Sequence, residues 1–334
     1  MEIKFLKAGT GDSILVQHKS YNIIIDGGND SKYLISEVDK IFSKGQSISL
    51  LVITHHDDDH IKGIIDLLNH INENGYNKEL SFIKKVIFNS PRKVLGKLPE
   101  YKSNHLSYKQ AYDVEELLTR TQADWTRYTD KSESIKFDDL VIDILSPTAE
   151  DLDKYSVQKG AYLTGDFKCD WNSPMDKLER YIDDNSIDKS ISNKSSIVLK
   201  LQTENKAILL TGDTTPDRLE SVLSKLTNEN DGNPVKFDIV KLPHHGSYRS
   251  ITKLIIEKIR CNTFIISTNS KKHFLPNKRA LLKILKYTDR TENQPINFVF
   301  NYEETINNLE ITKKEKNDYN FILTPNNKAY GISY

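Results

Sequence analysis

A short apolar run that ends in a cluster of histidines and aspartates constrains the fold of this chain more than any other feature. The run covers residues 48–53 and leads directly into residues 54–60, which read THHDDDH. An apolar run of this length is typical of a strand that is buried on both faces. Apolar residues then recur at helical spacing over 61–71, which predicts a helix that begins at about His60. The cluster therefore lies in a loop between a buried strand and a helix.

The candidate metal ligands in this loop are His55, Asp57, Asp59 and His60. Imidazole and carboxylate groups together suit zinc, manganese and iron. His55 and Asp57 can point to one side of the loop, whereas Asp59 and His60 lie at the turn into the helix, so one segment can serve two adjacent cations. A solvated helix cap accounts for one aspartate near a helix N-terminus. It does not account for three carboxylates between histidines, which would repel one another without a cation.

Further candidate residues follow other predicted strands, at positions where loops commonly carry function. These candidates are Asp26, Asp213, His244, His245 and His273. They come after predicted strands over residues 21–25, 207–210, 239–242 and 263–267. Each one taken alone also has an ordinary interpretation as a turn or surface residue. Their common position behind strands makes them candidates for the same site as the loop at 54–60.

The order of strands and helices predicts an α/β protein in which stacked sheets are flanked by helices. The remaining predicted strands cover residues 3–6, 14–16, 82–88, 140–145, 197–201, 297–299 and 320–323, and the remaining predicted helices cover 32–42 and 107–118. Residues 151–195 are polar and poorly periodic, apart from a helical piece near 174–182. We interpret them as a segment inserted over the surface of a single domain that covers residues 1–334.

Composition excludes several classes of protein. The chain has 47 basic and 47 acidic residues, so no long-range positive field recruits a polyanion. Its two cysteines, Cys169 and Cys261, form no CxxC pair, which argues against a disulfide framework or a cysteine zinc finger. No stretch approaches the roughly 18 apolar residues of a membrane span, and the N-terminus lacks the apolar core of a secretory signal. We therefore expect a cytoplasmic protein with no membrane partner.

Taken together, these motifs resemble the metallo-β-lactamase superfamily. Residues 54–60, with Gly63 after them, resemble its His-x-His-x-Asp-His signature, with Asp57 in place of the second histidine. This variant resembles the branch that contains the ComEC-type hydrolase domain. Other segments resemble family elements in the family's order, namely residues 5–13 with Gly9-Thr10-Gly11-Asp12, and residues 24–28, 193–199, 209–213, 242–247 and 267–276.

The resemblance implies a four-layer αββα sandwich with two divalent metal ions, zinc or manganese, at one edge of the two sheets. The implied ligands are His55 and Asp57 for one ion, Asp59 and His60 for the other, Asp213 for both, and His244 or alternatively His245 to complete a site. We favour His244 of the pair. Asp26 is expected to orient one of the metal-binding side chains, and not to bind the metal itself.

The chain departs from the family pattern at two places. Asn193 or Ser195 stands where the family usually has a third-motif histidine, which predicts a weaker second metal site. In the last loop, His273 and Pro276 are separated by two residues, whereas the family has them adjacent. A catalytic role for His273 therefore depends on where the fold places that loop.

The residues and the resemblance together predict a metal-dependent hydrolase. Two cations lower the pKa of a shared water and stabilise an oxyanion, and this produces a metal-activated hydroxide. Asp59 would orient this nucleophile, and His273 would protonate the leaving group. Ser247 would donate a hydrogen bond to a phosphate.

Three functions remain open. The first is a phosphodiesterase or nuclease with a nucleic acid substrate, which the resemblance implies. Local basic stretches also favour it, namely Lys84-Lys85, Arg92-Lys93 with Lys97, and Lys271-Lys272 with Lys278-Arg279. The second is hydrolysis of a small phosphodiester or another small ester, which the zero net charge fits equally well. The third is a metal-binding sensor or partner subunit with little turnover.

Overall fold

The strands form two large mixed sheets and one small sheet in this computed structural model, which describes residues 1–334 apart from 78–80, 91–105, 122, 157–168, 184–185 and 291–293. The seven-stranded sheet contains, in spatial order, β17 (Gly331–Ser333), β1 (Glu2–Leu6), β2 (Ile14–His18), β3 (Tyr21–Ile25), β4 (Leu50–Ile53), β5 (Lys85–Phe88) and β6 (Asp124–Thr126). The eight-stranded sheet contains β16 (Phe321–Thr324), β15 (Ile296–Phe300), β14 (Thr263–Ile266), β12 (Ile239–Lys241), β10 (Lys206–Leu210), β9 (Val198–Thr203), β8 (Leu140–Ser146) and β7 (Ile135–Phe137). The small sheet pairs β11 (Val235–Lys236) with β13 (Ile259–Arg260).

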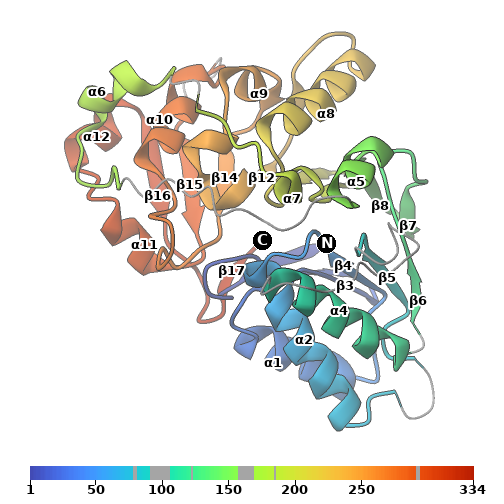
Figure 1. The fold of residues 1–334 in the computed structure, drawn as a ribbon. Coiled ribbons are helices and arrows are strands. Elements are labelled where there is room, and N and C mark those ends of the chain that lie inside the picture. Colours follow the sequence, from blue (N-terminus) through green and yellow to red (C-terminus); the bar gives the residue numbers. More distant parts are fainter. Residues whose placement is uncertain (78–80, 91–105, 122, 157–168, 184–185, 291–293) are drawn as a thin grey trace.

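Helices gather at two opposite ends of the molecule, outside the two large sheets (Figure 1). The helices on the side of the seven-stranded sheet are α1 (Lys32–Ser43), α2 (Asp58–Glu73) and α4 (Leu106–Thr119). Those on the side of the eight-stranded sheet are α8 (Pro216–Glu229), α9 (Lys253–Glu257) and α10 (Lys278–Tyr287). The shorter helices are α5 (Ala149–Ser156), α6 (Met175–Leu178), η1 (Glu179–Tyr181), α7 (Ile191–Lys194), η2 (Pro243–Gly246), η3 (Tyr248–Ser250), α11 (Glu303–Asn308) and α12 (Lys313–Asp318).

Three apolar clusters fill the interfaces between four layers. In β4, Leu50 and Val52 belong to the cluster between the two sheets, whereas Leu51 and Ile53 belong to the cluster beneath α1, α2 and α4. The third cluster packs α8, α9 and α10 against the other sheet, where it includes Leu209 of β10. Side chains alternate between the two faces of a strand, so a strand covered on both faces is apolar at most positions. This arrangement confirms the predicted αββα sandwich.

The central strands of each sheet run parallel, so their C-terminal ends meet at one edge. β3 pairs in parallel with β4, and β4 pairs with β5. In the other sheet β10, β12, β14 and β15 are successive parallel neighbours. The loops after these strands therefore gather at the sheet edges, where binding sites form in α/β proteins. Asp26, residues 54–57, Asp213 and residues 244–245 all lie in such loops.

Helix α2 begins at Asp58, two residues before the predicted start. Asp57 is its N-cap residue, and Asp58 and Asp59 lie in its first turn, where negative charge is favourable. Close packing places this turn, because a Cβ atom on Gly63 would lie 2.0 Å from the Gly27 carbonyl oxygen. The metal-binding motif therefore needs a glycine at 63 so that α2 can approach the loop after β3.

Helices α8 and α10 were not predicted from the sequence. The signal for α8 was present, because Thr215 and Pro216 form a typical helix start and residues 219, 222, 223 and 226 are apolar and buried. In α10, the basic residues that begin the helix obscured its apolar face.

The expected helical piece near 174–182 is present as α6 and η1. Within the predicted insertion over 151–195, residues 157–168 and 184–185 lie outside the described residues. In the part of the chain that the structure describes, every helix is too short or too polar to traverse a bilayer.

A partly buried ion pair connects β1 to α1. Lys4 Nζ lies 2.8 Å from Glu37 Oε2, and these side chains are 13% and 6% exposed. Lys40 Nζ also donates to Glu37, at 2.5 Å. Burial raises the pKa of Glu37, but the hydrogen bonds from Lys4 and Lys40 outweigh burial and hold that pKa below its ordinary value of 4.5. The pair therefore stabilises the fold above about pH 4.5 and loses this effect as the pH falls through the lower pKa of the folded protein.

We expect Glu37→Gln to lower the free energy of unfolding at pH 7 by about 1–3 kcal/mol, because two ammonium groups lose their partner. The difference from the wild type should shrink at a second, acidic pH well below 4.5, where the wild-type carboxylate also becomes protonated. Urea unfolding at the two pH values measures this. Glu150→Gln, in the exposed pair Glu150–Lys154, is the control and should change little. An equal loss of stability at both pH values would contradict the assignment.

Candidate metal centre

Three buried histidines point the same ring atom into the space between the sheet edges. His60 Nδ1 donates to Asp26 Oδ2 at 2.7 Å, and His245 Nδ1 donates to the Ser267 carbonyl oxygen at 2.9 Å. His55 Nδ1 lies 3.0 Å from Thr54 Oγ1. The Nε2 atoms of the three rings are buried and have no hydrogen-bond partner among the described residues. Because Nδ1 is the donor in each ring, the neutral ring presents the Nε2 lone pair, which is the arrangement of metal-bound imidazole.

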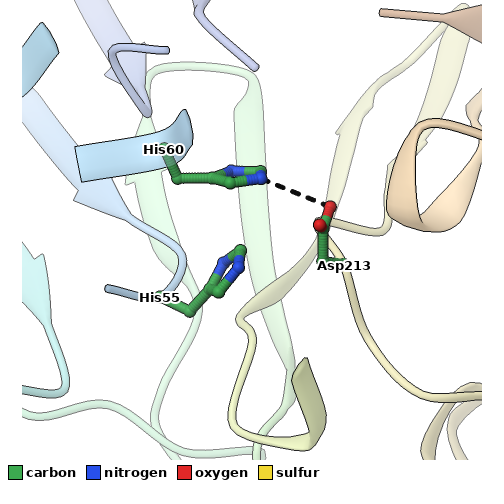
Figure 2. A group of neighbouring side chains, drawn as sticks. All are labelled: His55, His60 and Asp213. Atoms are coloured by element: carbon green, nitrogen blue, oxygen red, sulfur yellow. Dashed lines mark ion pairs between the residues drawn. The ribbon is translucent and has the colours of Figure 1, made fainter. Parts of the chain in front are cut away.

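Asp213 faces these nitrogens from the other sheet. Its Oδ1 atom lies 3.4 Å from His60 Nε2, and its Oδ2 atom lies 3.4 Å from His245 Nε2. Figure 2 marks the ion pair between His60 and Asp213 with a dashed line. The Asp213 backbone N–H donates to Ser196 Oγ at 3.2 Å. The preceding Gly212 has φ +52°, and a Cβ atom there would lie 2.3 Å from Ser196 Oγ. Glycine is therefore required for the turn that brings Asp213 between the histidines.

The ligand atoms form two adjacent groups that share His60. His55, His60 and Asp213 make one group, and Asp59, His60 and His245 make the other, with the ligand atoms of each group within 4.8 Å of one another. These nitrogen and carboxylate donors suit zinc or manganese. Because the Nε2 atoms and Asp213 Oδ1 are buried without hydrogen-bond partners, a polar occupant is required to satisfy them. The residues therefore fit a divalent metal centre.

Asp57 and Asp59 border the two groups from opposite sides. Asp57 Oδ2 lies 3.7 Å from His55 Nε2, and its other oxygen accepts a hydrogen bond from Ser192 Oγ at 2.8 Å. Burial raises the pKa of Asp57, but His55 outweighs burial, so the pKa lies well below its ordinary value. Asp59 Oδ2 lies 3.6 Å from His245 Nε2. Asp59 is therefore a member of the second group, whereas Asp57 faces His55 but belongs to neither group.

His244 and His245 both have a left-handed backbone. Their side chains nevertheless lie in two different environments. His245 is buried and belongs to one ligand group. His244, which the sequence favoured, is 29% exposed and lies outside these groups, with Nε2 4.0 Å from Asp213 Oδ2. Its Nδ1 atom lies 3.1 Å from Asp188 Oδ2, and Asn193 Nδ2 donates to the same oxygen at 2.7 Å. Asn193 therefore positions the carboxylate behind His244.

His273 and Ser247 lie at the margin of the centre. Burial lowers the pKa of His273, and the nearby His244 lowers it further. Asp59 is also within electrostatic range of this ring. Ser247 is buried, and its backbone N–H donates to the His244 carbonyl oxygen at 2.9 Å. The structure therefore brings the last loop to the centre, although the spacing of His273 and Pro276 departs from the family pattern.

The carboxylates make the centre attractive to cations. Burial lowers the pKa of His60, but Asp213 and Asp26 outweigh burial and raise it well above its ordinary value. In the same way Asp213 and Asp188 raise the pKa of His244 to about 9. His56 differs, because burial dominates there and lowers its pKa to about 4. The centre therefore binds protons where metal ions would bind, and metal binding must displace them.

Several residues that lie at the centre were not predicted from the sequence. They are Asp12, Thr54, Asp188, Ser192 and Lys241. Two of them had a signal. Asp12 ends the Gly-x-Gly-Asp turn, and Lys241 is a lysine within the apolar run 239–242. Asp188 and Ser192 lie in a polar segment that carried no such sequence signal.

We expect His245→Ala to weaken metal binding more than His244→Ala. Loss of His245 should cost more than the roughly 10–100-fold that removal of an outer partner costs, because its Nε2 atom lies in a ligand group. Equilibrium dialysis against zinc or manganese with elemental analysis measures this. His70→Ala, on the same helix as His60 but paired with Asp39, is the matched control and should leave metal binding unchanged. The reverse order of the two variants would show that His244 is the ligand.

This chain is similar to several known proteins. Residues 6–80 match the family model described as Metallo-beta-lactamase superfamily. ComE operon protein 3 of Bacillus subtilis (strain 168) is 22% identical over 303 residues, which cover 85% of this chain but only 30% of that protein. Among solved structures, YhfI from Bacillus subtilis is 9% identical and covers 100% of this chain and 98% of its own, with a TM-score of 0.43. Zn(2+)-bound PqqB from Methylobacterium extorquens is 10% identical, covers 100% and 99%, and has a TM-score of 0.45.

The match over residues 6–80 includes the Gly-x-Gly-Asp turn, Asp26 and the loop at 54–60. It confirms the resemblance that the sequence motifs indicated. Together with the clustered ligand atoms, it supports a metal-dependent hydrolase. Residues 6–80 of this αββα sandwich are therefore similar to the metallo-β-lactamase superfamily, and candidate ligands for divalent metal ions lie at the edge of its two sheets.

Proposed function

We propose that this chain is a metal-dependent phosphodiesterase whose favoured substrate is nucleic acid. The convergence on the Asp213 carboxylate of three Nε2 atoms, which have no hydrogen-bond partner in the part of the chain that the structure describes, carries the hydrolytic part of this proposal. Two divalent ions, zinc or manganese, would supply an activated water at neutral pH and stabilise negative charge on a phosphate. The exposed Lys272, whose ammonium lies 3.7 Å from Asp58 in the first turn of α2, supports a phosphate as the group that is attacked.

Asp59, His273 and Ser247 are the residues that we assign to the reaction itself. Asp59 is 23% exposed, and we assign its carboxylate to accept a hydrogen bond from the attacking water. His273 is half-buried and near Asp59, and we assign it as the donor to the leaving oxygen. The Ser247 hydroxyl would donate to a non-bridging phosphate oxygen.

The basic residues near the last loop divide into two kinds. Lys271 and Lys272 are exposed, and Lys272 Nζ lies 3.7 Å from Asp58 Oδ2, one residue before Asp59. Lys278 is buried and donates to the carbonyl oxygen of Ser173. Arg279 lies on the ring of Tyr248 at 3.6 Å. Only the first kind can meet a substrate phosphate without breaking the packing of the domain.

The second candidate function, hydrolysis of a small phosphodiester, gains support from this division. Two of the basic residues predicted to bind nucleic acid, Lys278 and Arg279, are engaged in the structure of the domain. Lys85 lies over the ring of Tyr128 at 5.3 Å, and Lys84 donates to the carbonyl oxygen of Ser81. The predicted stretch with Arg92, Lys93 and Lys97 lies outside the described residues. A compact substrate needs fewer cations than a polynucleotide.

We expect turnover of oligonucleotides and of a chromogenic phosphodiester in the presence of zinc or manganese. Single-stranded DNA, duplex DNA and RNA are compared, each at about 50 and 200 mM salt. A polynucleotide substrate should lose affinity steeply with salt, whereas a small substrate should respond weakly. Asp213→Asn should abolish turnover of every substrate, and Asp217→Asn, on the surface of α8, is the control. Full activity in Asp213→Asn, or no phosphodiester cleavage by protein loaded with metal, would overturn the proposal.

For Lys272→Gln we expect a higher KM for oligonucleotides with kcat nearly unchanged, because one phosphate contact is lost. The slope of log affinity against log salt should fall by about one. The chromogenic phosphodiester should be cleaved as well as by the wild type. Lys314→Gln, at an exposed position in α12, is the control. Steady-state kinetics over a salt series measures both effects, and an unchanged slope would exclude Lys272 from substrate binding.

A further inference from the structure

Lys241 is a buried lysine directly behind the metal centre. It ends β12, is 1% exposed, and is among the largest fully buried side chains among the described residues. Its ammonium group forms a close ion pair with Asp12 and donates to the Gly212 carbonyl oxygen at 3.0 Å. It also lies 3.7 Å from Asp213 Oδ1. An ammonium is costly to bury unless it is well paired, so these acceptors account for its position.

Asp12 is the carboxylate that Lys241 holds. Its other oxygen, Oδ1, is buried without a hydrogen-bond partner among the described residues and lies 3.7 Å from His245 Nδ1. Two further groups of candidate ligand atoms contain Asp12, one with Asp213 and His245 and one with Asp26 and His60. By geometry alone Asp12 is thus within reach of a cation. Lys241 already supplies that positive charge.

The charges around the centre balance only when Lys241 is counted. The carboxylates that surround the ligand groups are Asp12, Asp26, Asp57, Asp59 and Asp213. With His55, His60 and His245 neutral and His244 protonated, these five groups carry five negative charges, and Lys241 reduces this to four. Two divalent cations balance four negative charges. Asp58 and Asp188 do not enter the count, because Lys272 and His244 face them.

We propose that the Lys241 ammonium is a permanent cation of the metal centre. It keeps Asp12 out of the metal coordination and opposes the carboxylate charge when no metal is bound. This inference rests on the metal centre and not on the proposed substrate. It has two consequences. The ammonium stabilises the metal-free fold, and it weakens metal binding, because it repels a divalent ion on the far side of Asp213.

Lys241→Met tests this role, because methionine fills similar space without charge. Thermal unfolding of the metal-free protein should show a lower Tm for the variant. Dialysis or calorimetry with manganese should show binding at least tenfold tighter than in the wild type. Adding Asp12→Asn removes the buried carboxylate that has lost its partner, and the double variant should recover most of the metal-free Tm and lose the gain in affinity. Neither measurement involves substrate, so the result is independent of the hydrolysis assay.

Lys283→Met is the matched control. Lys283 is also a buried lysine, but its ammonium donates to the carbonyl oxygens of Tyr248 and Ile251. Its loss should lower the Tm and leave manganese affinity unchanged. Unchanged or weaker manganese binding in Lys241→Met would overturn the inference, since Lys241 would then serve packing or the geometry of Asp213. If Lys241→Met folds only with manganese, or only together with Asp12→Asn, the inference is supported. If neither condition restores folding, it is wrong.

Discussion

The carboxylate of Asp26 connects the elements from which the centre is built. One oxygen accepts the Thr54 backbone N–H at 2.7 Å, and the other accepts the Thr54 hydroxyl at 2.6 Å and His60 Nδ1 at 2.7 Å. A single side chain thus links the loop after β3 to the end of β4 and to α2. Because the Thr54 hydroxyl donates to Asp26, its oxygen is left to accept from His55. The orientation of both histidines, and therefore the exposure of their Nε2 atoms, depends on this one carboxylate.

The second sheet supplies the opposing half of the centre, and Thr54 is also where the halves meet. Its carbonyl oxygen accepts the backbone N–H of Ile197 at 3.0 Å, immediately before β9. Asp213 follows β10, the antiparallel partner of β9, so its distance from His60 follows from how the sheets pack. The apolar side chains between the sheets are therefore part of the geometry of the centre. A change in their volume would move Asp213 relative to the histidines before it altered any ligand.

Much of this arrangement was predictable from the sequence, and the remainder depends on contacts that local patterns do not record. Continuous apolar runs identified β4, β10 and β12, because strands covered on both faces leave that pattern. The density of ligands at 54–60 identified the loop, and the structure brings Asp213 to it. The roles of Lys241 and Asp188 could not be predicted, because they depend on partners at Asp12 and His244 that are distant in the sequence. The lysine interrupts an apolar run, but that run does not identify its partner, and an aspartate in a polar segment has no distinctive pattern of its own.

The zero net charge of the chain hides a strong local separation of charge. The centre concentrates carboxylates that are compensated only in part by Lys241 and by protonated histidines. In the metal-free state this negative field repels a phosphate, and the exposed Lys272 is itself drawn toward Asp58. Two divalent ions would cancel the field and free Lys272 to meet an anion. Metal loading would then control substrate binding as well as chemistry, since over distances of about 10 Å the sign of the local field decides whether an anion can approach.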